Sequence, residues 1–335
     1  MPQPTLSDVH VDRPLTTMSV AYQVDQTDCV AGKAFPSIPV VSKSDEYFIY
    51  NRGDFFRDDM QLRAAGTPAA GTGYKLATGT YTAQVWALAK TISDQIRQNS
   101  DVPLNPDRDA TAFLTGKALL NREVQWCSKY FGTGVWGGEL YGAASASAGV
   151  AIKYWNLSGS TPIEDVLAAR TAIKKATGFW PNKLVLGANT HTTLKTNPEI
   201  IDRLKYGQTA PGPVVVDNNN LAPLFEVEEI LVTSAIKTTS GDTLVPDSDT
   251  TPDTFDFIGG NHALLCYAAK SPGLQTASAG YTFNWMGQTG SMGAGMRMKK
   301  YRWEILASDI LEVEQAYAFG LVSKFLGYMF LNATQ

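Results

Sequence analysis

The sequence predicts an α+β fold, on three observations. Short segments with the alternation typical of strands dominate residues 45–93 and 263–319. Residues 105–131 have the period of one long helix. Residues 161–233 alternate helical and strand-type segments, which indicates a separate α/β module with its own core. With 335 residues, of which 44% are hydrophobic and 18% charged, the chain is long enough for about two domains.

The composition argues against several classes of protein. The formal net charge is −4, from 28 basic and 32 acidic residues, whereas a dedicated nucleic-acid binder needs a basic excess. The opening residues lack the pattern of a secretory signal, and no apolar run reaches the roughly 18–20 residues of a membrane span. The three cysteines, Cys29, Cys127 and Cys266, are far apart and are expected to be buried thiols. We therefore expect the chain to fold in a reducing cytoplasm.

Residues 1–44 are expected to form an extended arm rather than a domain. Prolines at positions 2, 4, 14, 36 and 39 interrupt any long helix or strand. The short β-prone pieces between them bury little surface by themselves. The arm therefore needs another surface to lie on, either that of its own subunit or that of a neighbour.

Residues 45–92 are expected to form a long β-hairpin. Tyr47–Tyr50 is a short aromatic strand, Asn51–Asp54 has the residues of a turn, and alternation from Tyr81 to Ala89 indicates the return strand. The tip, Ala64–Lys75, is rich in glycine and small residues. Because an isolated hairpin is only marginally stable in water, a projection of this length is expected in an assembly rather than in a monomer.

The long helix is predicted by signals at both ends. Asn105 can cap its start, Pro106 suits its first position, and Asp107 interacts favourably with the helix dipole. Glycines at 132 and 134 end it. Its predicted apolar face consists of Phe113, Leu120, Val124, Cys127 and Phe131.

The α/β module begins at Thr161–Glu164, which has the pattern of a capping box, and its first helix should end at Gly178. A second helix is expected to start at Asn197–Pro198, and residues 238–254 form a polar, acidic loop. The predicted strands of the module and of the chain after it are 183–187, 214–216, 229–233, 263–269, 281–286, 297–305, 310–319 and 325–331.

The search for chemistry predicts no catalytic, cofactor-binding or metal site. Gly132–Gly137 matches G-x-G-x-x-G, but it follows a helix, whereas the dinucleotide fingerprint follows a strand. The run Arg297–Trp303 distributes its aromatic residues among cations, so it forms no pure stacking platform for bases. Neither the histidines nor the acidic loop residues have metal-ligand spacing: His10, His191, His262, Asp247, Asp249 and Asp253.

The order of these parts carries a family resemblance. Residues 35–60, FPSIPVVSKSDEYFIYNRGDFFRDDM, are similar to an arm-to-hairpin passage; residues 118–131, ALLNREVQWCSKYF, are similar to a spine helix; and residues 162–206 are similar to the start of an axial domain. In this order they resemble the major capsid proteins of tailed bacteriophages, whose fold is named after phage Hong Kong 97. The resemblance covers most of the chain.

The resemblance implies a four-part subunit with a structural role. The parts would be an N-terminal arm (1–44), an extension loop (45–92), a peripheral domain with the spine helix (93–154 and 296–335), and an axial domain (155–295). The arm and the extension loop would each reach a neighbouring subunit. Pentamers and hexamers of the chain would form an icosahedral shell.

The resemblance also implies partners and a location. The shell would enclose double-stranded DNA without sequence-specific binding, in a virion assembled in the cytoplasm of a host bacterium, with no membrane and no cofactor. Since Met1 leads directly into the arm, we expect a separate scaffolding protein rather than a cleaved scaffolding domain. A portal is a further expected partner, and the resemblance allows a decoration protein.

The predicted intersubunit contacts are the charged residues of the hairpin: Arg52, Asp54, Arg57, Asp58, Asp59, Arg63 and Lys75. Exposed ion pairs contribute only about 0–1 kcal/mol each, so these contacts would act through repetition over a shell. Three alternatives stay open. The chain could form an encapsulin-like compartment, act as an adhesion protein through Arg52-Gly53-Asp54, or be an α/β enzyme that uses His191 or the Gly132–Gly138 turn.

Overall fold

The computed structural model describes residues 25–100, 105–207, 216–240, 254–273, 275–287 and 295–335. The predictions for His10, for the acidic loop residues 247, 249 and 253, for the first 24 residues of the arm, and for all but one residue of the strand at 214–216 lie outside these ranges. Within them, no helix is both long and apolar enough to cross a bilayer.

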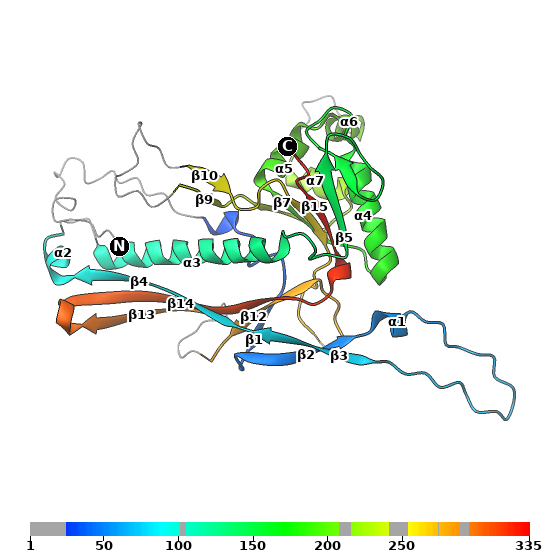
Figure 1. Cartoon of the computed structure of the whole chain (residues 1–335), viewed down its shortest axis with the longest axis horizontal. Helices are drawn as coiled ribbons and strands as arrows, with labels where there is room; N and C mark the ends of the chain where they lie inside the picture. The colour runs from blue at the N-terminus through cyan, green and yellow to red at the C-terminus, as the bar shows by residue number, and fades with distance from the viewer. Residues whose placement is uncertain (1–24, 101–104, 208–215, 241–253, 274, 288–294) are drawn as a thin grey trace.

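The first sheet is built on one long strand, β14 (Ser308–Leu321). One edge of β14 pairs with β4 (Gln84–Ser93). The other edge pairs with β13 (Met296–Trp303) along residues 308–315 and with β12 (Gly280–Trp285) along residues 317–321, and all three pairings are antiparallel. β1 (Ser37–Val40) pairs with β12 in parallel. The turn between β13 and β14 contains a 3-10 helix, η3 (Glu304–Leu306). This turn lies at one end of the long axis of the molecule (Figure 1).

The second sheet has six strands in the order β6 (Ala151–Lys153), β5 (Gly138–Ala143), β15 (Gly327–Leu331), β11 (Ala263–Cys266), β7 (Lys183–Gly187) and β8 (Glu229–Thr233). The helices packed around it are α4 (Pro162–Thr177), α5 (Ala188–Thr196), α6 (Pro198–Gly207) and α7 (Asn218–Leu224). A small ribbon of β9 (Ile236–Thr238) and β10 (Phe255–Phe257) follows β8.

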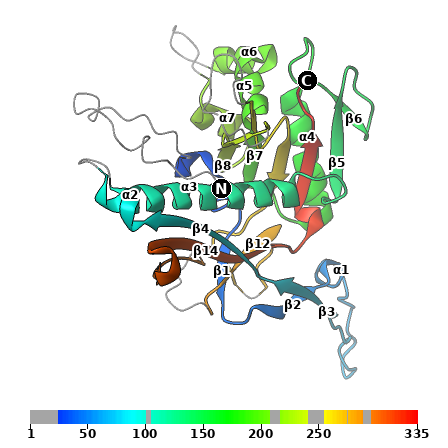
Figure 2. The ribbon, with the colours of Figure 1, turned by 60° about the vertical axis from the view of Figure 1, so that its left-hand side comes forward.

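The predicted long helix is confirmed as α3 (Pro106–Tyr130), and the Asn105 side chain caps it by accepting from the Arg108 amide. It runs alongside β4 and β14, with the six-stranded sheet beyond its C-terminal half (Figures 1 and 2). The predicted apolar face was partly wrong, because Phe113 is exposed and its neighbour Leu114 is buried. The buried residues of α3 are Ala110, Leu114, Ala118, Glu123, Trp126, Cys127 and Tyr130.

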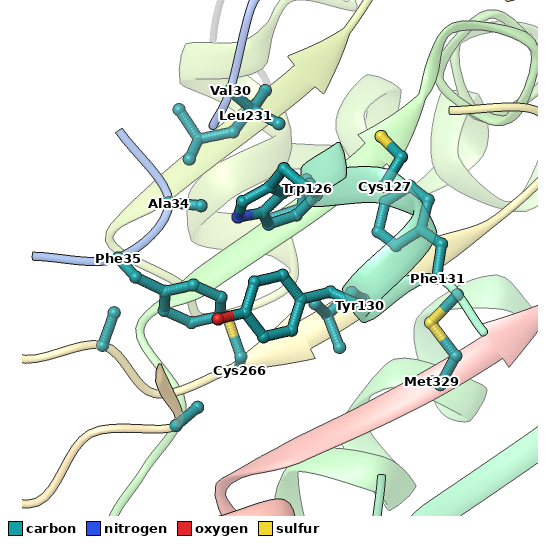
Figure 3. Close-up of a cluster of buried hydrophobic side chains, with 14 of the residues drawn as sticks. Val30, Ala34, Phe35, Trp126, Cys127, Tyr130, Phe131, Leu231, Cys266 and Met329 are labelled. Atoms are coloured by element: carbon teal, nitrogen blue, oxygen red, sulfur yellow. The ribbon is translucent and has the colours of Figure 1, made fainter. Parts of the chain in front are cut away.

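The described part of the predicted arm packs on its own chain. After η2 (Gln26–Asp28), residues 29–36 enter the core between α3 and the six-stranded sheet, where Phe35 lies 4.9 Å from the ring centre of Tyr130 and 6.1 Å from that of Trp126 (Figure 3). Residues 37–40 then form β1. Residues 29–36 are therefore anchored in their own subunit, and the intersubunit role of the arm stays a prediction.

The sheets divide the chain differently from the predicted domains. β5, β6 and β15 pair in the six-stranded sheet, although residues 93–154 and 296–335 were assigned to the peripheral domain. β12 pairs with β14, although residues 155–295 were assigned to the axial domain. Pairing joins strands that are far apart in the sequence, as Tyr141 and Leu331 show, so both sheets cross the predicted boundaries, and the four-part division stays a prediction.

The two ends of α4 differ in how well local signals predict them. Gly178 ends α4 with a φ of +81°, as predicted. The predicted capping box at Thr161–Glu164 is wrong, because the Thr161 side chain makes no capping hydrogen bond within the described residues. Instead the Glu199 carboxylate, from α6, accepts from the Ile163 amide at 3.4 Å.

The predicted β-hairpin consists of β2 (Ser44–Tyr50) and β3 (Leu76–Thr82), paired from Ser44 with Thr82 to Tyr50 with Leu76. The predicted turn at Asn51–Asp54 is one turn of helix, α1 (Arg52–Phe55), capped by Asn51. Residues 56–75 project beyond it at the other end of the long axis (Figure 1). β3 leads through Ala83 into β4, and β4 leads into α2 (Asp94–Gln98).

Candidate assembly interface

The base of the hairpin is closed by Asp54. Its carboxylate accepts from the Lys75 amide at 2.9 Å and pairs with Arg57 at 3.3 Å. The Asn51 amide donates to the Lys75 carbonyl at 3.3 Å, which completes the closure. The hydrogen bond from the Lys75 amide holds the pKa of Asp54 below its ordinary value. The side chain of Asp54 is only 5% exposed, and its hydrogen bond to Lys75 holds the two sides of the hairpin base together.

Arg52 faces the body of its own chain. Its guanidinium donates to the Ala176 carbonyl at 2.6 Å and lies 3.8 Å from the ring centre of Phe325. Arg52 and Asp54 are thus both engaged within one subunit. This arrangement disfavours the adhesion alternative, which requires an exposed Asp54.

The remaining predicted contact residues shape the projecting loop. Asp59 accepts from the Thr72 hydroxyl at 2.6 Å across the loop, and Arg63 donates to the Thr67 carbonyl at 2.5 Å. Asp58 accepts from the Met60 amide at 3.3 Å. The structure therefore brings Asp54, Arg57 and Lys75 together, and distributes Asp58, Asp59 and Arg63 along the loop.

Large apolar side chains on and beside the hairpin form a surface that the sequence interpretation missed. Leu62 is 104% exposed and Met60 is 92% exposed. A signal was available, because a two-stranded projection has no interior and must expose any large apolar residue that it carries. We call this set the hairpin apolar surface: Val41, Phe48, Phe55, Phe56, Met60, Leu62, Tyr74 and Leu76.

A second apolar surface lies at the β13–β14 turn, at the opposite end of the long axis (Figure 1). Trp303, Ile305 and Leu306 are exposed there. The adjacent charges are paired within the subunit. Arg97 contacts Asp107 at 3.0 Å and Asp309 at 2.8 Å. These ion pairs join α2, α3 and β14 and so stiffen the support of the turn.

The cations of β13 are also paired within the subunit. Lys299 contacts Glu314 at 2.5 Å, and Arg302 contacts Asp94 at 2.5 Å. Lys300 contacts Asp107 at 3.1 Å. Because carboxylates neutralise these side chains, β13 is poorly suited to bind phosphates.

The residues considered for catalysis have structural partners. His191 contacts the Asn218 side-chain oxygen at 2.6 Å, and His262 accepts from the Asn332 amide at 3.1 Å. Burial lowers the pKa of both histidines. Within the described residues, no group of three or more metal-ligating side chains occurs, and the three cysteines are free and buried.

The glycine-rich turn after α3 is occupied by the chain itself. The Glu139 carboxylate accepts from the Gly134 amide at 3.0 Å and from the Trp136 amide at 3.1 Å. A bound phosphate would need free backbone amides, and Glu139 already occupies these two. The turn therefore has the structural role predicted for it.

Comparison with known proteins gives one match in sequence. No family profile matches the chain. The major capsid protein of Burkholderia phage BcepMu is 32% identical over 137 residues, which are 39% of this chain and 40% of the relative. The match therefore spans well under half of the phage protein.

Solved structures match over nearly the whole chain. A phage-related protein from Bordetella bronchiseptica RB50 has a TM-score of 0.63 at 20% identity and covers 92% of this chain and 93% of its own. The mature capsid of bacteriophage PhiM1 has a TM-score of 0.60 at 11% identity, over 97% and 92%. The SrpI encapsulin from Synechococcus elongatus PCC 7942 has a TM-score of 0.52 at 13% identity, over 96% and 95%. The chain therefore has the α+β fold of phage capsid proteins, which confirms the resemblance to that family predicted from its sequence.

Proposed function

We propose that the chain is the major capsid protein of a tailed phage, which assembles into the pentamers and hexamers of an icosahedral head. The observation that carries this proposal is the combination of a capsid fold with a projecting hairpin whose large apolar side chains are exposed to solvent in the single subunit. Fully burying a side chain such as Leu62 or Met60 contributes about 1.5–3 kcal/mol. A neighbouring subunit would supply that burial.

The placement of the two apolar surfaces favours a ring. The hairpin apolar surface and the β13–β14 turn lie at opposite ends of the long axis and consist of different residues (Figure 1). Contact between unlike surfaces is heterologous, and a heterologous contact generates a ring when its rotation closes. Five- and six-membered rings are such closed forms.

The role is structural rather than catalytic. The side chains considered for chemistry are occupied by partners within the fold, and the capsid relatives point to the same role. The paired cations of β13 and the net charge of −4 fit a shell that encloses double-stranded DNA without binding its sequence. We propose the virion as its location, after assembly in the host cytoplasm with a separate scaffolding protein and a portal, and with a decoration protein as a further partner.

Negative-stain electron microscopy of the purified chain, alone and with a scaffolding protein from the same phage, tests the proposal. Closed shells of uniform size are expected. A species that stays monomeric in every condition, together with its absence from virions, would contradict the proposal.

An encapsulin-like compartment is the second candidate, because the SrpI encapsulin matches over 96% of the chain. The contents of purified particles separate the two functions. Nuclease-protected DNA supports the phage head, whereas a co-purifying enzyme in DNA-free shells supports a compartment.

A further inference from the structure

The base of the hairpin contacts the part of the chain that contains the six-stranded sheet (the body), at the C-terminal end of α4. We propose that α1 is a clasp that fixes the direction of the loop 56–75 relative to this body, with Arg52 as the positioning residue. The contact joins residues far apart in the sequence, since Arg52 donates to the carbonyl of Ala176 in the last turn of α4.

The end of α4 is a suitable receptor for a cation. The last four carbonyls of an α-helix have no partner within the helix, and they carry partial negative charge. The Gly178 amide satisfies the Lys174 carbonyl, and Arg52 satisfies that of Ala176 at 2.6 Å. Arg52 thus provides a hydrogen bond that the helix itself cannot make.

Arg52 also contacts a second element of the same body. Its guanidinium lies 3.8 Å from the ring centre of Phe325, in η4 (Lys324–Leu326). The next residue, Leu326, is buried in the core and leads directly into β15. One side chain therefore connects α1 both to α4 and to the segment that enters β15, an interior strand of the six-stranded sheet.

A glycine makes room for the clasp. A Cβ atom built on Gly178 would lie 2.5 Å from Cζ of Phe56, the residue after α1. Gly178 also has a φ of +81°, which only glycine adopts without strain. The position therefore serves two purposes, since it ends α4 and lets the Phe56 ring approach.

The other side of α1 is attached to both strands of the hairpin. Asn51 continues β2, and its amide donates to the carbonyl of Lys75, which precedes β3. Asp54, within α1, accepts from the Lys75 amide. Because α1 is bonded to the hairpin on one side and to α4 on the other, it transmits the orientation of the body to the loop.

Distances between spin labels on Ala70→Cys in the loop and Ala172→Cys on α4 test the clasp. The three native cysteines are buried, so labels attach selectively to the exposed new sites. Labelled chain is diluted with unlabelled chain and measured below the concentration at which it assembles, so each distance belongs to one free subunit. No neighbour then holds the loop, and the result does not depend on the proposed function.

Arg52→Ala is expected to replace a single narrow distance peak by a broad distribution. Arg57→Ala is the matched control, because Arg57 lies in the same segment and, among the described residues, its ion pair is with Asp54. It should keep the narrow peak. Gly178→Ala, which displaces Phe56, should broaden the distribution as Arg52→Ala does. An unchanged narrow peak in both Arg52→Ala and Gly178→Ala would overturn the proposal.

Discussion

The apolar residues of the loop, rather than its charges, should control assembly. Leu62 and Met60 are 104% and 92% exposed in the single subunit. If a neighbour buries both, replacing them with serine removes about 3–6 kcal/mol from each contact, at about 1.5–3 kcal/mol per side chain. Since about 1.4 kcal/mol is a factor of ten, the association constant should fall by roughly two to four orders of magnitude.

The assay is the threshold concentration for assembly, measured by light scattering and sedimentation velocity. The double variant Met60→Ser/Leu62→Ser should fold normally, because substitutions of exposed residues change stability by only about 0.5 kcal/mol. Thermal unfolding of the unassembled subunit checks this. A raised threshold with an unchanged melting temperature assigns the loss to the contact between subunits.

Arg57→Glu is the comparison. Arg57 was a predicted intersubunit contact, and its side chain is 60% exposed. An exposed ion pair contributes about 0–1 kcal/mol, so this variant should raise the threshold by less than about tenfold. Assembly of the serine double variant at the wild-type threshold, or a larger effect of Arg57→Glu, would refute the reasoning.

Three further predictions concern the fold. Burial raises the pKa of Glu123, so the wild-type chain gains most stability from it in acid and loses that gain as the pH rises through the folded-state pKa. The melting temperature of Glu123→Gln should therefore rise relative to that of the wild type as the pH rises above the ordinary pKa of a glutamate, and a difference that shrinks with pH would contradict this. Phe35→Ala should cost about 3–5 kcal/mol in denaturant unfolding, whereas Phe48→Ala, at an exposed site, should cost about 0.5 kcal/mol or less; equal losses would be inconsistent with the described core. Gly142→Ala should give insoluble chain, because its Cβ would lie 1.8 Å from the Asn332 carbonyl oxygen, and a soluble variant with wild-type melting would argue against the pairing of β5 with β15.

Local signals explain which elements could be predicted from the sequence. The predicted helix at 105–131 is observed at Pro106–Tyr130, because its cap, its proline and the glycines after it act within a few residues. The buried face of this helix was harder to predict, because Phe113 and Leu114 are adjacent and equally apolar. Sheet membership could not be predicted, since β15 finds its partner β5 far back in the chain.

The position of the hairpin could be predicted from the sequence, but the partners of its charged side chains could not. The hairpin is where the sequence indicates it, yet Arg52 and Asp54 are engaged within the subunit. Arg52 is engaged because it contacts Ala176, which lies far away in the sequence, and no pattern of neighbouring residues predicts such a contact. The exposed apolar residues become informative only once the hairpin is known to project without a cover.

Single-particle electron microscopy of particles assembled from this chain tests the central claim most directly. We expect a closed icosahedral shell in which residues 56–75 of each subunit lie on a neighbour that covers Leu62. A shell in which these residues contact only their own subunit, or leave Leu62 exposed to solvent, would contradict it.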